Sequence, residues 1–360
     1  MGKRCLIVIL LLWCLVPAYG SQIPREVTDA IPDSARSLLD NTDKAEDFTT
    51  LNDGLSTLWE RTCKLLASTV QESLGGVILI LSAVLLCAIA EDCFHPLAGG
   101  KLLDPVPLVG TLVILLAVGS NMKNLMGLGT ETIEELNVFS KALLPTLSAA
   151  TAAGGGAVSA GVRQVATVFF SDLLMSLIHS LLFPLVWVYV ALSAADVILP
   201  AGRLGGIAQG LKKAVTWVLS GGLMLFTGYL SLSGAFASSA DGLTLRMARS
   251  AIGTAIPVVG GIISDAADTI LAGAGVLRQS LGVLGTLTIL AVCILPFLKL
   301  GVQYLLLKLS AFFASAVAPE PLVKLLSALS SAFGLVLGMT GAAALLLLIS
   351  IASSVMVVYV

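Results

Sequence analysis

Apolar runs separated by short polar stretches make up the chain from residue 73 to its carboxyl end. A helix of about 20 apolar residues crosses the hydrocarbon core of a bilayer. The pattern predicts six such spans, and a seventh over 302–318, where Lys308 interrupts the run. The six cover residues 74–90, 107–125, 177–199, 214–236, 281–298 and 333–358. The sequence therefore predicts an all-α, polytopic membrane protein with about seven spans.

Composition supports this class. Hydrophobic residues make up 57% of the chain and charged residues 12%, whereas about 25% of residues are charged in soluble domains. The mean hydropathy is +1.00. A soluble globular domain of 360 residues is excluded, because too few charged side chains are available to cover its surface.

The first twenty residues have the pattern of a secretory signal peptide. Lys3 and Arg4 precede an apolar core over 6–16, and small residues follow at 18–20. We expect cleavage after Gly20. An uncleaved first anchor is the alternative.

Residues 21–72 form the one sizeable polar segment and hold ten acidic residues against five basic ones. Leucines at three- and four-residue steps from Leu51 to Leu66 predict an amphipathic helix leading into the membrane. A solvated linker is the alternative. The expected domains are a signal peptide (1–20), an acidic extracytoplasmic arm (21–72) and a membrane domain (73–360).

Orientation follows from the lysines and arginines of short loops, which collect on the cytoplasmic side. Arg203, Lys212 and Lys213 mark 200–213 as a cytoplasmic loop. With seven spans, this places the acidic arm and residues 237–280 outside the cytoplasm and the carboxyl terminus inside.

Two glycine-rich stretches, 142–162 and 256–277, are too polar to be ordinary spans. Backbone that is not helical is tolerated at membrane depth only against protein or water. The sequence thus predicts two re-entrant or broken helices. The expected helix breakers are Gly154, Gly155, Gly156, Pro257, Gly260 and Gly261.

Charges cluster around the second of these stretches. Asp265 and Asp268 are three residues apart, as are Arg246 and Arg249, so each pair shares a helix face. Matched spacing predicts two Arg–Asp pairs across a hairpin closed at 257–261. Capping of a helix by Asp265 and a direct role in a transport path are the alternatives. Asp241 and Arg278 flank the cluster as further candidate charges.

No pattern for catalysis, a cofactor or a metal is present in the sequence. The stretch GGIAQGLKK (205–213) resembles a phosphate-binding loop but lacks the Lys-Ser or Lys-Thr that holds phosphate and Mg²⁺. The two histidines, His95 and His179, are far apart. We expect no enzyme activity, no cofactor and no nucleic acid partner, and ATP-driven work would require a separate subunit.

The stretch ADGLTLRMARSAIGTAIPVVGGIISDAADTILAGAGVLRQSLGVLG (240–285) resembles the stage III sporulation protein AE family of endospore-forming bacteria. So do a turn at 296–299 in ILPFLKL, the APEPL of 318–322 and the glycine-rich LLPTLSAATAAGGGAVSAG (143–161). These motifs are structural rather than catalytic, and the similarity covers nearly the whole chain.

The resemblance implies a multi-pass protein of the mother-cell membrane around the forespore. It implies a permease-like subunit of a channel complex, with a cytoplasmic ATPase and intermembrane ring proteins as partners, in addition to the lipid bilayer. Two classes of function remain open, a conduit or gate and a non-conducting scaffold for the rings and the ATPase. A stand-alone secondary transporter is a third, weaker possibility.

Overall fold

The computed structural model describes residues 23–39, 51–94, 105–198, 204–255 and 260–356, although not every side chain within these helices. Every element in these ranges is helical. The helices are α2 (Arg25–Asp29), α3 (Asp33–Leu39), α4 (Leu51–Phe94), α5 (Pro105–Ala153), α6 (Ala157–Leu177), the π-helical turn η1 (Ile178–Leu182), α7 (Phe183–Ile198), α8 (Gly205–Ala255), α9 (Gly260–Ala314) and α10 (Glu320–Met356). Among the described residues, six helical segments are long and apolar enough to cross a membrane, with α6, η1 and α7 counted as one.

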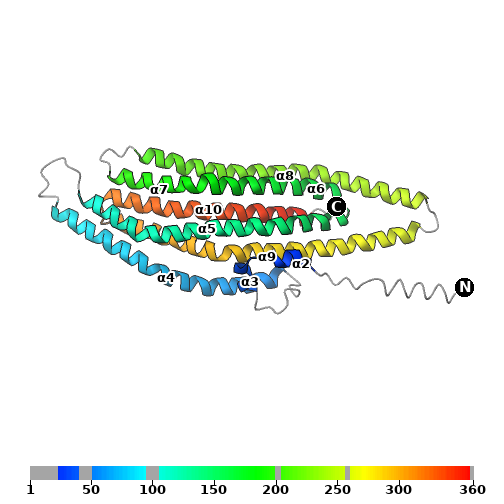
Figure 1. Ribbon diagram of the computed structural model, residues 1–360, viewed down its shortest axis with the longest axis horizontal. Coiled ribbons are helices and arrows are strands. Elements are labelled where there is room, and N and C mark those ends of the chain that lie inside the picture. Colours follow the sequence, from blue (N-terminus) through cyan, green and yellow to red (C-terminus); the bar gives the residue numbers. More distant parts are fainter. Residues whose placement is uncertain (1–22, 40–50, 95–104, 199–203, 256–259, 357–360) are drawn as a thin grey trace.

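The long helices lie alongside one another in an elongated bundle (Figure 1). At one end, which we call the loop end, α4, α7 and α9 finish and α5, α8 and α10 begin. At the opposite end, the hairpin end, α5 is followed by α6 and α8 by α9. The α8–α9 hairpin extends beyond the ends of α5, α6 and α10 (Figure 1).

These helices are much longer than a bilayer is thick. Helix α10 has 37 residues and α9 has 55, which corresponds to about 55 to 83 Å at 1.5 Å per residue. A hydrocarbon core measures only about 30 Å. A single bilayer therefore surrounds only part of the bundle.

Exposed large apolar side chains indicate which part that is. Those of α4, α5, α8 and α9 are densest within about 30 Å of the loop end, by helix rise. They include Leu74, Ile78, Leu79, Leu85, Leu86, Ile89, Leu108, Leu112, Leu116, Trp217, Met224, Leu225, Phe297, Leu305, Leu309 and Phe312. Farther along, α5 carries Glu131, Glu134 and Lys141 on its exposed side. We call the first region the apolar band; it has the thickness that a bilayer requires.

The expectation of two separate spans over 281–298 and 302–318 is wrong. Helix α9 covers 281–298 and most of 302–318, up to Ala314, and Pro296, expected in a turn, lies inside that helix. Proline is tolerated in helices at membrane depth because neighbouring groups satisfy the freed carbonyl. Among the described residues the candidate spans number six, and α4 and α10 run in opposite directions (Figure 1).

Neither glycine-rich stretch is a short re-entrant segment. Gly154–Gly156 form a corner between α5 and α6, and Gly155 has a φ of 88°, a conformation that glycine adopts without strain. The chain turns at this corner, where a helix break was expected. In the second, α8 ends at Ala255 and α9 begins at Gly260. Gly260 and Gly261 therefore start a helix, while Pro257 lies outside the described residues.

The amino-terminal arm packs on the bundle. Val27 and Ala35 of α2 and α3 are fully buried in the common core, and Ser34 donates a hydrogen bond of 2.6 Å to Glu135 on α5. Residues 51–66, where an amphipathic helix was expected, form the first part of α4. Because α4 is continuous, the boundary expected at residue 72 falls within a helix, and the signal peptide lies outside the described residues.

Glycines allow α9 to approach its neighbours closely. A Cβ on Gly285 would lie 2.6 Å from Leu143 of α5, and one on Gly282 would lie 2.5 Å from Val355 of α10. These distances leave no room for a methyl group. The central position of α9 between α5 and α10 thus depends on small residues, as is common where membrane helices pack.

Six crossings predict that the two ends of the helical region share one side of the membrane. A reporter fused after residue 60 and a reporter fused to the carboxyl terminus should report the same side, and a reporter at residue 200 the opposite side. Paired phosphatase and fluorescent-protein fusions measure this. Opposite sides for residue 60 and the carboxyl terminus would restore the seventh crossing and contradict the continuous α9.

Candidate functional site

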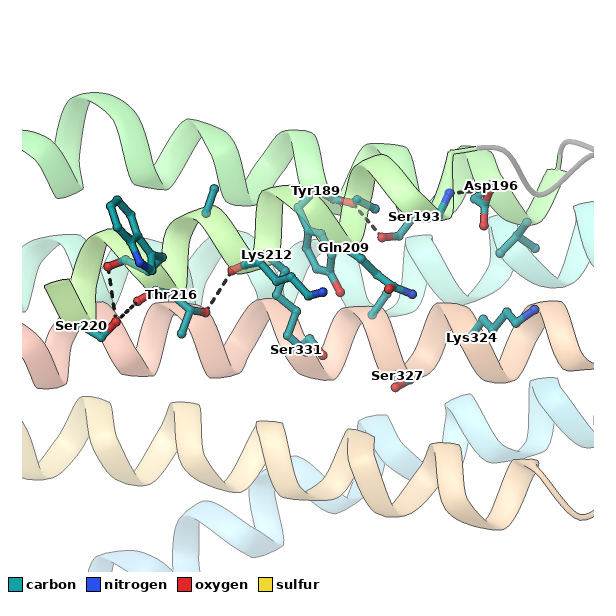
Figure 2. A pocket seen from close by; sticks show the side chains of 17 residues that line it. Tyr189, Ser193, Asp196, Gln209, Lys212, Thr216, Ser220, Lys324, Ser327 and Ser331 are labelled. Carbon is teal, nitrogen blue, oxygen red and sulfur yellow. Dashed lines mark hydrogen bonds between the residues drawn. The ribbon is translucent and has the colours of Figure 1, made fainter.

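A groove with a volume of about 920 Å³ lies between α7, α8 and α10 and reaches the loop end. Its lining is rich in hydroxyl and charged side chains (Figure 2). The polar members are Tyr189, Ser193, Asp196, Gln209, Lys212, Lys213, Thr216, Ser220, Lys324, Ser327 and Ser331. From Gly205 to Ser220 the groove follows α8 for about 23 Å by helix rise, most of the depth of the apolar band.

The sequences of α7 and α8 explain why these polar side chains line one groove. Tyr189, Ser193 and Asp196 recur at three- and four-residue steps on α7, so they share one helix face. The same spacing relates Gln209, Lys212, Thr216 and Ser220 on α8. The hydroxyl groups of Ser193, Thr216 and Ser220 donate to carbonyls one turn earlier in their own helices. Their oxygens keep lone pairs that can accept hydrogen bonds from groups in the groove.

Asp196 fixes the geometry of the groove at the loop end. One of its carboxylate oxygens accepts hydrogen bonds from the backbone amides of Leu204 (2.9 Å) and Gly205 (2.8 Å). These amides at the start of α8 have no partner within the helix, and a carboxylate there also complements the helix dipole. A Cβ on Gly205 would lie 2.7 Å from Asp196, so a glycine is needed for this approach.

Lysines give the groove an excess of positive charge. The Nζ of Lys212 donates to the Ser331 hydroxyl of α10 at 2.9 Å, and Lys324 pairs with Glu320 at 2.8 Å. Among the described residues, no carboxylate forms an ion pair with Lys212 or Lys213. Asp196 keeps its negative charge when it accepts from neutral amides, so the three lysines, set against Asp196 and Glu320, leave the groove one net positive charge.

The groove was not predicted from the sequence. Residues 200–213 were expected to form a loop, whereas α8 begins at Gly205 and places Lys212 and Lys213 two turns inside a helix. The helix can begin at Gly205 because 205–213 is free of proline and glycines are tolerated inside membrane helices. The periodic hydroxyls and lysines within apolar runs were the signal that could have revealed the groove.

The hairpin end holds a second polar centre. Asp241 of α8 is 7% exposed, and its carboxylate accepts a hydrogen bond of 2.9 Å from the backbone amide of Val158. Val158 lies in the first turn of α6, just after the triglycine corner, where Gly156 offers no capping side chain. Asp241 therefore caps α6 from another helix, at a point where that helix leaves an amide without an internal partner.

Of the other charged residues singled out in the sequence, the structure describes the side chain of Arg278 alone. Arg278 of α9 is buried, with 4% exposure. It lies one turn beyond Ala274, whose Cβ would be 3.9 Å from a Cβ on Gly154, so α9 also faces the corner. The side chains of Arg246, Arg249, Asp265 and Asp268 lie outside the described residues. The backbone places Asp265 beyond the first turn of α9, which disagrees with its expected role as a helix cap.

The described residues contain no group of three or more His, Cys, Asp or Glu side chains that could hold a metal ion. The chemistry available in the groove is the binding of polar or anionic groups, because it presents ammonium donors and hydroxyl oxygens.

The cap supplied by Asp241 can be tested by substitution. Replacing Asp241 with Ala should lower the free energy of unfolding by about 1 to 2 kcal/mol, the usual cost of losing a helix cap. Asp241→Asn should retain most of the stability, since its amide oxygen can still accept from Val158. Thermal unfolding of the purified protein measures both. Asp172→Ala, an exposed position on α6, is the matched control and should leave the transition unchanged; a similar loss in the control would contradict the assignment.

Comparison with known proteins identifies the family of this chain. The family model of stage III sporulation protein AE matches residues 41–358. A relative from Bacillus subtilis (strain 168) described as stage III sporulation protein AE is 28% identical over 257 residues, which cover 71% of this chain and 64% of that relative. The match thus spans less than two thirds of the relative's length. No solved structure matches the chain. Because the family model covers most of its length, the chain belongs to the stage III sporulation protein AE family.

Proposed function

We propose that this chain is the permease-like membrane subunit of the channel complex that links mother cell and forespore, and that it acts as a conduit or gate after engulfment. Its place is the mother-cell membrane around the forespore, with the loop end in the cytoplasm. Family membership and six apolar helices support a sporulation protein of the membrane. Lys212, Lys213 and Lys324 near the loop end support the orientation, because lysines favour the cytoplasmic side.

The groove between α7, α8 and α10 is the observation that most directly supports a role as a conduit. It brings lysines and hydroxyls about 23 Å into a region otherwise faced with apolar side chains. Polar groups at membrane depth are costly unless they face protein or water.

A non-conducting scaffold is the second candidate, supported by the length of the bundle. Beyond the apolar band, every long helix continues toward the hairpin end (Figure 1), and α6 exposes Val165, Phe169 and Leu173 there. A rigid extracytoplasmic body suits contact with intermembrane ring proteins. In either role, a separate cytoplasmic ATPase would supply energy, and neither role requires this chain to be an enzyme.

Filling the groove with larger side chains distinguishes a conduit from a non-conducting scaffold. Thr216→Leu combined with Ser220→Leu should leave membrane abundance normal, because both positions are exposed, while heat-resistant spore counts fall strongly. Immunoblots of membrane fractions and spore counts, in a sporulating host that carries the variant in place of its own gene, measure this. Ser180→Leu, an exposed serine outside the groove, is the control and should sporulate normally. Normal sporulation in the groove variant would contradict the conduit and favour the scaffold.

The tip of the α8–α9 hairpin provides a further test. Arg246 and Arg249 precede the end of α8 by nearly as many residues as Asp265 and Asp268 follow the start of α9, so the two pairs lie at similar heights. By helix rise the tip is about 60 Å or more from the loop end, well beyond the apolar band. We propose that the four charges form pairs in water, each worth about 0 to 1 kcal/mol.

Replacing Asp265 and Asp268 with Asn should then leave the abundance of the protein close to normal, since no charge is stranded in hydrocarbon. The reciprocal swap, with arginines at the two aspartate positions and aspartates at Arg246 and Arg249, should behave in the same way. Abundance and spore counts of both variants are measured together. A strong loss of abundance in the Asn variant, rescued by the swap, would show that the pairs are buried and contradict this placement. Normal abundance with failed sporulation would instead assign the aspartates a role in transport or partner contact.

A further inference from the structure

The groove opens on the outer surface of the bundle rather than into its centre. Lys212, Lys213 and Thr216 are exposed, whereas the α8 side chains that face the other helices, such as Val215 and Leu219, are buried. Ammonium groups at the depth of the apolar band cannot face hydrocarbon without a large cost. A ligand with polar groups that covers the mouth of the groove would remove this cost.

The charged side chains at the mouth of the groove favour an anionic ligand. Lys324 pairs with Glu320, and Lys212 and Lys213 exceed the remaining Asp196 carboxylate by one positive charge. Gln209, one turn earlier on α8, adds amide N–H donors to the lining. A phosphate group with a single negative charge fits this set, because it accepts several hydrogen bonds and balances that excess.

The depth of the lysines points to a phosphate carried by lipid. By helix rise, Lys212 and Lys213 lie about 10 to 12 Å from the start of α8, and the polar layer of a bilayer is about 5 to 7 Å thick on each side. Lysines just below this layer extend their ammonium groups toward it. Below them, Trp217 is 77% exposed, and Met224 and Leu225 continue an exposed apolar surface on the same helix. Acyl chains can lie against that surface, whereas a free phosphate compound would gain nothing from it.

We propose that the mouth of the groove binds the phosphate of an anionic phospholipid through Lys212 and Lys213, with the acyl chains packed along α8 beside Trp217. This inference goes beyond the proposed function, since such a site would serve a conduit and a scaffold equally. The lipid closes the side of the groove that faces the bilayer and leaves Thr216 and Ser220 behind it.

The test uses the purified full-length chain in discs of phosphatidylcholine containing a minor fraction of phosphatidylglycerol. Native mass spectrometry after release from the discs counts the lipids that remain bound. The wild-type protein should retain phosphatidylglycerol in preference to phosphatidylcholine. Lys212→Ala with Lys213→Ala should reduce that preference about 25-fold, or about fivefold for each lysine, and the double Arg variant should preserve most of it.

A matched control removes the same amount of charge elsewhere. Lys299 and Lys308 lie on α9 outside the groove, and Lys308 donates to the Tyr304 hydroxyl of its own helix. Lys299→Ala with Lys308→Ala should keep the preference for phosphatidylglycerol. Equal loss in both double variants would overturn the proposal, because it would reflect net charge alone. Thermal unfolding in phosphatidylcholine discs confirms that each variant is folded before lipid binding is scored.

A second arm distinguishes the source of the phosphate. Glycerol 3-phosphate and inorganic phosphate at millimolar concentration should neither displace phosphatidylglycerol nor stabilise the protein in pure phosphatidylcholine. Displacement at those concentrations would assign the site to a soluble phosphate compound and contradict the lipid. Unchanged lipid preference in the Lys212/Lys213 variant would show that the groove holds no anionic lipid at all.

Discussion

Backbone hydrogen bonding inside a hydrocarbon layer is the constraint on which this structure depends. Each amide and carbonyl there must find a partner within the chain, so a crossing has to be an unbroken helix. In the described residues, the helices continue through Pro184 and Pro296, while their ends gather at the two ends of the bundle (Figure 1). At each end of the bundle, an aspartate of another helix accepts hydrogen bonds from backbone amides where a helix begins. Asp196 does so for α8, and Asp241 does so for α6. These caps allow sharp corners without stranded polar groups.

The requirement that backbone groups in hydrocarbon find partners also divides the bundle into two regions, one near the loop end and one toward the hairpin end. Near the loop end, exposed side chains are largely apolar, and polar groups appear chiefly in one groove. Toward the hairpin end, charges such as Glu131 and Glu134 lie on the surface, and the arm helices α2 and α3 pack on α5 and α9. A chain whose helices extend far beyond one bilayer places an ordered helical body outside the hydrocarbon layer.

Composition and periodicity predicted the all-helical membrane class, the helix from Leu51 and the break at Gly154–Gly156, because these depend on local hydropathy and on glycine's backbone freedom. They failed where neighbouring helices decide the outcome. Pro296 suggests a turn, yet packing keeps α9 continuous. Lys212 and Lys213 suggest a loop, yet a capped helix contains them. Asp241 was found as a charge near a glycine-rich stretch, but its cap on α6 joins residues 83 positions apart, a relation that no local pattern contains.

The groove shows how a polar stripe can be maintained on the outside of a membrane bundle. Its hydroxyls bond to their own helices, so α8 carries Thr216 and Ser220 at little cost even where lipid surrounds them. Lys212 and Lys213 differ, because no carboxylate of α8 lies one turn from either of them. Lys212 reaches Ser331 across the gap to α10, and that contact ties the two helices together while leaving the charge unbalanced. The position of the lysines near the loop end follows from this imbalance, since only there can a long side chain reach water, phosphate or a charged partner.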